Sequence, residues 1–186
     1  ATEVTYTIHA DYNNANRVLI SYYGGIYFSS NGGTTFTQIH TALTGSGNVV
    51  AGVFFDGNNI YIGTNDGMLI STNGGSTFNL STIPGLGANE VIWSFCAAKS
   101  GTTTRFFCLT SDAANVYVGL QGSDYWGFLG GVYTCDYGTT NWSAVMNGIT
   151  VGTDFPMFVD MAENNINTVY LAGSNSNGEP NIMKST

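Results

Sequence analysis

The chain has 186 residues, which is enough for one domain with a buried core. Only 9% of the residues are charged, and twelve acidic side chains against four Lys and Arg give a net charge of −8. This composition excludes nucleic acid and anionic membrane surfaces as partners, because the chain has no basic patch that could neutralise phosphates. No apolar run reaches 18 residues, so we expect no membrane span.

The surface composition predicts a secreted or extracellular protein, with the periplasm as an alternative. Asn, Thr, Ser and Gly are abundant, and Ala1 could follow a removed signal sequence. The two histidines, His9 and His40, are far apart in the sequence, and no Cys or His spacing is typical of a metal site. We therefore expect neither a metal nor a cofactor.

Short runs of β-branched and aromatic residues, separated by Gly, Asn and Asp turns, predict an all-β protein without a clear helical period. The expected strands form groups of four, named A (innermost) to D. The first group, approximately residues 1–47, has strands near 3–9, 17–22, 26–30 and 35–39. The second group, residues 48–88, has strands at 48–55, 59–64, 68–72 and 77–82.

The third group, residues 89–152, is longer because residues 112–130 form an insertion between its second and third strands. Its strands are expected at 90–98, 104–110, 131–135 and 142–146. An alternative makes 104–111 the A strand and 115–120 the B strand. The fourth group, residues 153–186, is incomplete, with strands at 155–161, 168–173 and 181–185 and no D strand.

A turn motif follows the third strand of each group. Residues 29–36 read Ser-Ser-Asn-Gly-Gly-Thr-Thr-Phe, and residues 71–78 read Ser-Thr-Asn-Gly-Gly-Ser-Thr-Phe. A diverged copy starts at Thr134, with Asp136 in place of the Asn and one extra residue before Trp142. Ser185 begins the motif again. We expect the Asn or Asp to cap backbone amides, the glycines to supply positive φ angles, and the ring to pack beneath the sheet.

The first Ser or Thr of these copies recurs after about 42, 63 and 51 residues, within or just beyond the length of a four-stranded propeller blade. At these residues the chain resembles Asp-box (BNR-repeat) β-propellers over nearly its whole length. The resemblance implies one partial propeller domain, residues 1–186, with about three complete antiparallel blades and a truncated fourth.

An open propeller leaves two unpaired edges, and propellers typically close with four to eight blades. We therefore expect a fragment, or a chain whose propeller is completed by a segment of the same or another chain. A closed four-bladed ring without its last strand is a third arrangement.

Within the Asp-box group, the chain is similar to glycoside hydrolase family 74 and to sortilin-like receptors. Sialidases bind the substrate carboxylate with three arginines, and Arg17 and Arg105 are the only two in this chain, so sialidase activity is not expected. Family 74 places an Asp before a Gly-Gly-x-Tyr sequence. Residues 24–27 reproduce that sequence, but Tyr22 and Tyr23 stand where the acid would be. No catalytic residue is carried over from this resemblance.

In a propeller, the B–C turns and the D–A loops share the face at which ligands usually bind. Asp124, Tyr125 and Trp126 in the insertion place two rings beside a carboxylate, and Tyr22 and Tyr23 occupy the B–C turn of the first blade. Aromatic faces stack on the C–H surfaces of sugars, while carboxylates accept sugar hydroxyl protons. We predict that these five residues contact polysaccharide; alternatively, the rings of the insertion pack it onto its blade.

Glu90 and Asp154 begin the A strands of the third and fourth blades, so they should lie around the mouth of the central channel, with Asn48 and Glu3 as their counterparts. Glycoside hydrolysis needs two carboxyl groups about 5 to 10 Å apart. Glu90 and Asp154 are therefore the candidate catalytic acid and base. The alternative is that both face solvent or cap turns.

Cys96 and Cys108 would lie on neighbouring strands, where they form a disulfide if directly opposite or remain buried free thiols. Cys135 would be left over. Together, these features predict a secreted propeller that binds or hydrolyses polysaccharide, with enzymatic activity undecided. The alternative is a non-catalytic interaction propeller of the adhesin, receptor or assembly-factor type.

Overall fold

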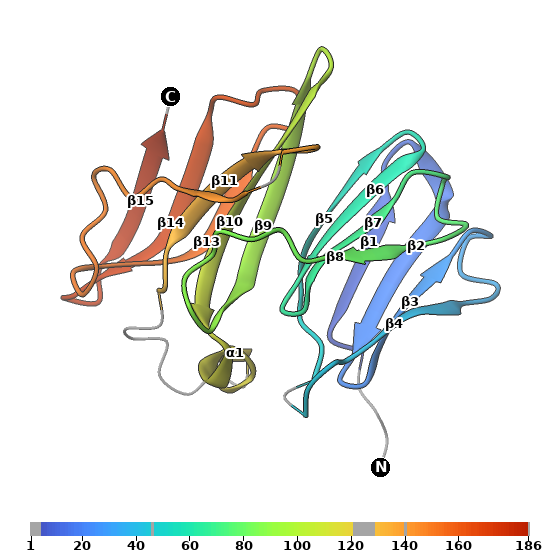
Figure 1. Ribbon diagram of the computed structural model, residues 1–186, viewed down its shortest axis with the longest axis horizontal. Helices are drawn as coiled ribbons and strands as arrows, with labels where there is room; N and C mark the ends of the chain where they lie inside the picture. Colours follow the sequence, from blue (N-terminus) through green and yellow to red (C-terminus); the bar gives the residue numbers. More distant parts are fainter. Residues whose placement is uncertain (1–4, 46, 121–128, 140, 186) are drawn as a thin grey trace.

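The computed structural model describes residues 5–45, 47–120, 129–139 and 141–185. These residues form a β-propeller of four separate antiparallel sheets, in which each strand pairs with its neighbours in the sequence (Figure 1). Three blades have four strands and the fourth has three. The all-β fold class is therefore confirmed.

The strand bounds of the first two blades are as follows. Blade one contains β1 (Thr7–Asp11), β2 (Asn14–Tyr22), β3 (Gly25–Ser29) and β4 (Thr37–Thr41). Blade two contains β5 (Val50–Asp56), β6 (Asn59–Thr64), β7 (Gly67–Ser71) and β8 (Asn79–Ser81).

The third and fourth blades follow the same order. Blade three contains β9 (Glu90–Ser100), β10 (Thr103–Asp112), β11 (Val132–Asp136) and β12 (Ser143–Ala144). Blade four contains β13 (Asp154–Met161), β14 (Val169–Asn175) and β15 (Pro180–Ser185).

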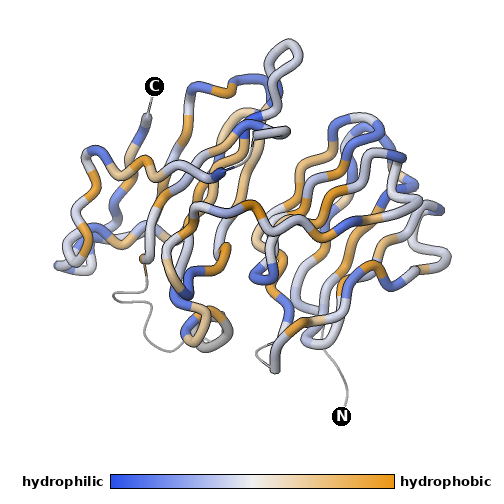
Figure 2. The backbone as a smooth tube through the Cα atoms, viewed as in Figure 1, coloured by the Kyte–Doolittle hydropathy of each residue, from blue (hydrophilic) through white to orange (hydrophobic). Residues whose placement is uncertain are grey.

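The blades stand side by side in the order of the sequence. The innermost strands touch along the series, because β5 packs on β9 and β9 packs on β13. Blades one and four lie at opposite ends of the row, so the described blades form an open arc (Figure 1). Apolar residues run along the strands, and polar residues gather at the turns (Figure 2).

Three hydrophobic clusters fill the spaces between neighbouring blades. The first, between blades one and two, includes Leu19, Phe28 and Ile60. The other two lie between blades two and three and between blades three and four. Because side chains of a strand alternate between its two faces, each sheet contributes to the cluster on either side of it.

The strand register decides the state of the cysteines. Cys96 pairs with Phe107, and Cys108 pairs with Phe95, so the two cysteines are offset by one residue. They therefore face opposite sides of the sheet, Cys96 toward blade four and Cys108 toward blade two. Both are free buried thiols, as is Cys135, which selects the thiol alternative over the disulfide.

One helix, α1 (Ala113–Leu120), follows β10 directly, although the sequence showed no clear helical period. The carboxylate of Asp112 accepts the N–H of Ala114 at 2.8 Å, as an N-terminal cap does. The alternative that placed a B strand at 115–120 is therefore wrong, and the preferred B strand at 104–110 corresponds to β10.

The repeated turn has the expected geometry in its first two copies. Asn31 Oδ1 accepts the N–H of Thr35 at 2.9 Å, and Asn73 Oδ1 accepts the N–H of Thr77 at 3.0 Å. In the second copy, Ser71 Oγ accepts the N–H of Gly75 at 2.9 Å. Gly75 has a φ of 91°, which favours glycine because it has no Cβ.

The third copy keeps the turn as expected, with Asp136 at the position of the Asn. Thr139 Oγ1 donates to the carbonyl of Asp136 at 2.7 Å, as Ser76 Oγ donates to that of Asn73 in the second copy. Trp142 lies three positions after Thr139, whereas Phe78 lies two positions after Ser76, so the extra residue before Trp142 is confirmed.

Candidate ligand-binding face

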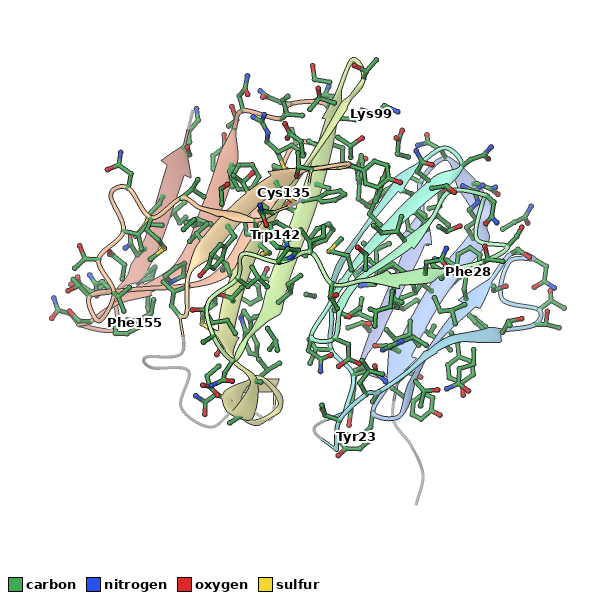
Figure 3. All side chains as sticks on the ribbon, in the orientation of Figure 1. Tyr23, Phe28, Lys99, Cys135, Trp142 and Phe155 are labelled. Carbon is green, nitrogen blue, oxygen red and sulfur yellow. The ribbon has the colours of Figure 1, made fainter. Side chains whose placement is uncertain are left out.

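One end of the propeller collects the B–C turns, the D–A loops and the start of every A strand. In Figure 3, Tyr23 marks this end and Lys99 marks the opposite one. We call it the loop face. Its described residues include 22–25, 42–45, 47–50, 64–67, 82–90, 129–131, 150–154 and 175–180.

Tyr22 and Tyr23 of blade one lie at the loop face. The Tyr22 and Tyr27 hydroxyls are 3.1 Å apart, and their ring centroids are 5.4 Å apart. Tyr23 is 39% exposed, and its hydroxyl donates to the carbonyl of Gly45. The N–H of Asn48 also donates to the Tyr23 carbonyl at 2.9 Å. Tyr23 is thus held at both its backbone and its hydroxyl while part of its ring stays open to solvent.

The D–A loop between blades one and two is fixed by amide side chains. Asn65 Oδ1 accepts the N–H of Val49 at 2.8 Å, and Asn65 Nδ2 donates to the carbonyl of Gly47 at 2.9 Å. Asn48, expected at the channel mouth, is only 1% exposed. These contacts give the loop beside Tyr23 a defined conformation.

A side-chain hydrogen bond that the sequence analysis did not identify joins the same two blades. His40 Nε2 lies 2.7 Å from Asp66 Oδ2, and the exposed fractions of the two side chains are 8% and 4%. The N–H of Leu43 donates to the same oxygen at 3.0 Å. The sequence pattern could have indicated Asp66, because this residue lies in a B–C turn on the face where ligands are expected to bind.

Glu90 is half-buried at the start of β9. Thr110 Oγ1 donates to Glu90 Oε2 at 2.5 Å, and a Cβ added at Gly130 would lie 2.6 Å from the Glu90 carboxyl carbon. Burial and the neighbouring Glu90 carboxylate raise the pKa of Tyr133. The Tyr133 hydroxyl accepts the N–H of Gly87 at 3.1 Å. The carboxylate of Glu90 therefore sits in a close-fitting polar environment.

Asp154 has its own hydrogen-bond partners in and beside blade four. Its Oδ2 accepts the N–H of Thr150 at 2.8 Å, and its Oδ1 accepts from Asn181 Nδ2 at 2.9 Å. Both candidate catalytic carboxylates thus lie at the loop face, each tied to different neighbours. Their pairing as acid and base stays a prediction.

Glu90 shares a small pocket with Asp66. The pocket, of about 230 Å³, lies between blades two and three. Its apolar wall includes Met68, Ile92 and Trp142. A hollow with two carboxylates and an apolar wall can accept hydroxyl protons while covering a carbon surface.

The other predicted contacts, Asp124, Tyr125 and Trp126, lie outside the described residues, as does Glu3. Within the described ranges, no three His, Cys, Asp or Glu side chains gather as metal ligands would. No helix in the described part of the chain is long and apolar enough to cross a membrane.

Solved structures resemble this chain. An ancestral GH74 enzyme superposes with a TM-score of 0.67 at 19% identity, covering 99% of this chain and 27% of that enzyme. YCF48 bound to a D1 peptide gives a TM-score of 0.48 at 11% identity, covering 92% of this chain and 47% of that one. For YCF48 from Cyanidioschyzon merolae the values are 0.41 and 12%, with coverages of 98% and 71%.

The likeness to the GH74 enzyme confirms the propeller fold. This chain spans about a quarter of that enzyme's length and about half of the peptide-bound YCF48. No family model and no curated protein matches the chain.

Proposed function

We propose that this chain is part of a secreted Asp-box propeller of the glycan-degrading kind, and that its loop face binds polysaccharide. Two observations support the Asp-box assignment: the matching turns at Asn31 and Asn73, and a fold shared with an ancestral GH74 enzyme. The low content of charged residues, 9%, is the basis for proposing secretion.

The observation that carries the binding proposal is the fixed, partly exposed ring of Tyr23 beside the Tyr22–Tyr27 pair. A ring held by its backbone and hydroxyl loses little conformational freedom when a sugar stacks on it. Asp66 and Glu90 open into a pocket where carboxylates could accept sugar hydroxyl protons. Asp124, Tyr125 and Trp126 would add contacts from the insertion.

The binding test compares two exposed tyrosines at opposite ends of the molecule. We expect Tyr23→Ala to weaken retention in gels containing neutral polysaccharides roughly tenfold, because a stacked ring contributes on the order of 1 kcal/mol. Tyr23→Phe keeps the ring and should retain binding.

Tyr12→Ala is the matched control, because Tyr12 is 98% exposed and lies in the A–B turn at the other end. Equal retention of the Tyr23→Ala and Tyr12→Ala proteins, with wild-type binding intact, would contradict the assignment of the loop face.

Hydrolysis is tested separately by reducing-sugar release from the polysaccharides that bind. If the chain contains the acid and base, Glu90→Gln and Asp154→Asn should each abolish release and leave retention in the gel nearly unchanged. Retention without any release by the wild type would instead make the chain a binding module. The interaction-propeller alternative would be favoured if no polysaccharide is retained.

A further inference from the structure

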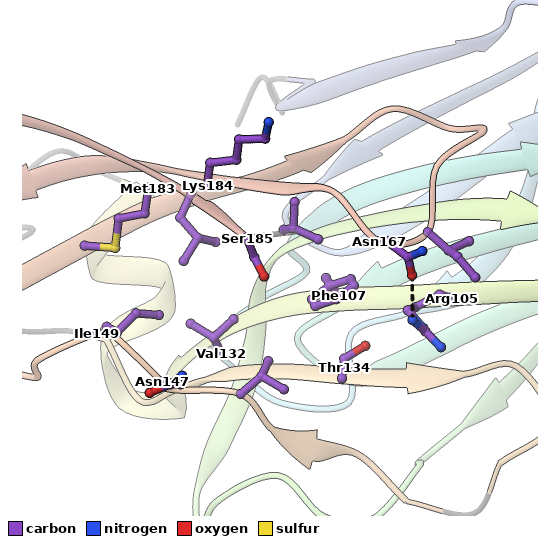
Figure 4. Close-up of a pocket in the computed structure, with 15 residues that line it drawn as sticks. Arg105, Phe107, Val132, Thr134, Asn147, Ile149, Asn167, Met183, Lys184 and Ser185 are labelled. Carbon is purple, nitrogen blue, oxygen red and sulfur yellow. Dashed lines mark hydrogen bonds between the residues drawn. The ribbon is translucent and has the colours of Figure 1, made fainter.

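Polar side chains bridge neighbouring blades at the end opposite the loop face. Lys99 Nζ lies 2.6 Å from Asp56 Oδ2, and this contact joins blades three and two. Arg105 Nη1 donates to Asn167 Oδ1 at 3.4 Å, which joins blades three and four (Figure 4). Both bridges lie beside the turns between first and second strands. Between blades one and two, by contrast, a side-chain bridge lies at the loop face.

The bridge at the loop face is the buried contact between His40 and Asp66. An ionised carboxylate only accepts hydrogen bonds, so His40 Nε2 is the donor. The same carboxylate oxygen, Oδ2, also accepts the N–H of Leu43, two residues beyond the end of β4. Hydrogen bonds to a charged group are roughly twice as strong as those between neutral groups. Asp66 therefore fixes both the end of β4 and the start of the loop that follows it.

The loop that follows β4 holds Tyr23 at two atoms. The carbonyl of Gly45 accepts the Tyr23 hydroxyl, and the N–H of Asn48 donates to the Tyr23 carbonyl at 2.9 Å. Asn65 anchors the later part of this loop, because its Nδ2 donates to the carbonyl of Gly47 at 2.9 Å. Gly45 lies in the earlier part, which starts at the bridge. The orientation of the Tyr23 ring, set by its hydroxyl, therefore depends on the earlier part of the loop.

We propose that His40 and Asp66 are positioning residues of the loop face: they hold the start of the loop so that its Gly45 carbonyl keeps the Tyr23 ring in the orientation on which a sugar stacks. This inference rests on the proposed function, because the same ring carries that proposal. Ordering a mobile side chain during binding lowers the affinity roughly two- to tenfold. Without the bridge, polysaccharide binding has to order both the loop and the ring. His40 therefore raises the affinity without contacting the sugar.

The roles of Asp66 in the pocket and in the bridge are separated by changing His40. Asp66 lines the pocket that it shares with Glu90, so its own substitution removes a pocket carboxylate as well as the bridge. His40 lies outside the lining that the described residues give this pocket. His40→Ala removes the donor from the bridge, whereas His40→Gln keeps an N–H donor on a side chain of similar length. The two His40 variants therefore isolate the bridge.

The binding test measures retention in gels that contain hydroxyethyl cellulose, a soluble neutral polysaccharide. We expect His40→Ala to weaken retention roughly threefold or more, and His40→Gln to stay within about twofold of the wild type. In a Tyr23→Ala background, His40→Ala should cause no further loss, because the bridge acts through that ring. Equal retention of the wild type and His40→Ala, or the same loss from His40→Ala in both backgrounds, would overturn the proposal.

Hydrogen exchange of the protein without polysaccharide distinguishes this proposal from the proposed function. His40→Ala should speed exchange at residues 42–45, because the acceptor of the Leu43 amide is no longer fixed, and His40→Gln should not. Asp56→Ala is the control, since it breaks the bridge to Lys99 at the opposite end and should leave residues 42–45 unchanged. Unchanged exchange in His40→Ala would overturn the positioning role whether or not the gel retains the protein. Faster exchange, with no retention of the wild type, would support the bridge as the anchor of this loop and count against polysaccharide binding.

Discussion

His9 is a partly buried side chain on β1, and its buried Nε2 atom has no described hydrogen-bond partner. Burial lowers its pKa from the ordinary value of 6.5. Below pH 6.5 the unfolded chain therefore binds a proton that the folded chain does not, and the free energy of unfolding falls as the pH falls. The maximum slope for one such group is about 1.4 kcal/mol per pH unit.

We expect the stability of the wild type to fall more steeply between pH 7.5 and pH 5 than that of His9→Gln. Urea unfolding at several pH values measures both slopes, and the difference removes the contribution of the carboxylates. Parallel slopes would show that His9 titrates in the folded protein as it does in the unfolded chain.

The candidate site was only partly predictable at the level of residues. The position of Tyr22 and Tyr23 could be predicted, because a turn between two strand patterns must lie at one end of the blade. The contact between His40 and Asp66 could not, because it joins residues 26 positions apart on different blades. Its formation depends on how the blades pack together, which no local pattern encodes.

At the level of elements, the register of β9 and β10 keeps the cysteines apart and unreactive. Burial raises the pKa of Cys135 to about 12, and burial also raises those of Cys96 and Cys108. All three thiols therefore stay protonated at neutral pH, whereas the thiolate is the reactive form.

We expect the folded protein to react slowly with iodoacetamide at pH 8, and the urea-unfolded protein to take up three labels without prior reduction. Mass spectrometry counts the labels. A single label on the non-reduced, unfolded chain would reveal a disulfide and contradict the register.

The strands were more predictable than the other elements because β-branched runs and Gly or Asn turns are local signals. The helix α1 escaped detection because it is short and begins directly at the end of β10, where Asp112 caps it. The third turn could be aligned in spite of its divergence, because Asp136 and Thr139 keep the turn contact that Asn73 and Ser76 make.

On the scale of the whole molecule, the blades are held together by the clusters between them. Phe106 is fully buried between blades two and three, with ring centroids 5.0 Å from Tyr61 and 5.6 Å from Phe95. We expect Phe106→Ala to lower the free energy of unfolding by about 3–5 kcal/mol, because it leaves a cavity in this contact.

Phe158→Ala is the matched control for Phe106→Ala, since Phe158 is 63% exposed on the outer face of blade four. It should change the stability by less than about 0.5 kcal/mol. Urea unfolding measures both variants. A large loss for Phe158→Ala would mean that its face is covered in solution, and a small loss for Phe106→Ala would contradict the blade packing.

We propose that one end of this propeller, the loop face, binds polysaccharide. Hydrogen exchange followed by mass spectrometry, with and without a polysaccharide that the protein retains, tests it most directly. We expect slower exchange at residues 22–25 and 42–49, and unchanged exchange in the turns 29–36 and 71–78 at the opposite end. Protection confined to those two turns, or spread equally over both ends, would contradict it.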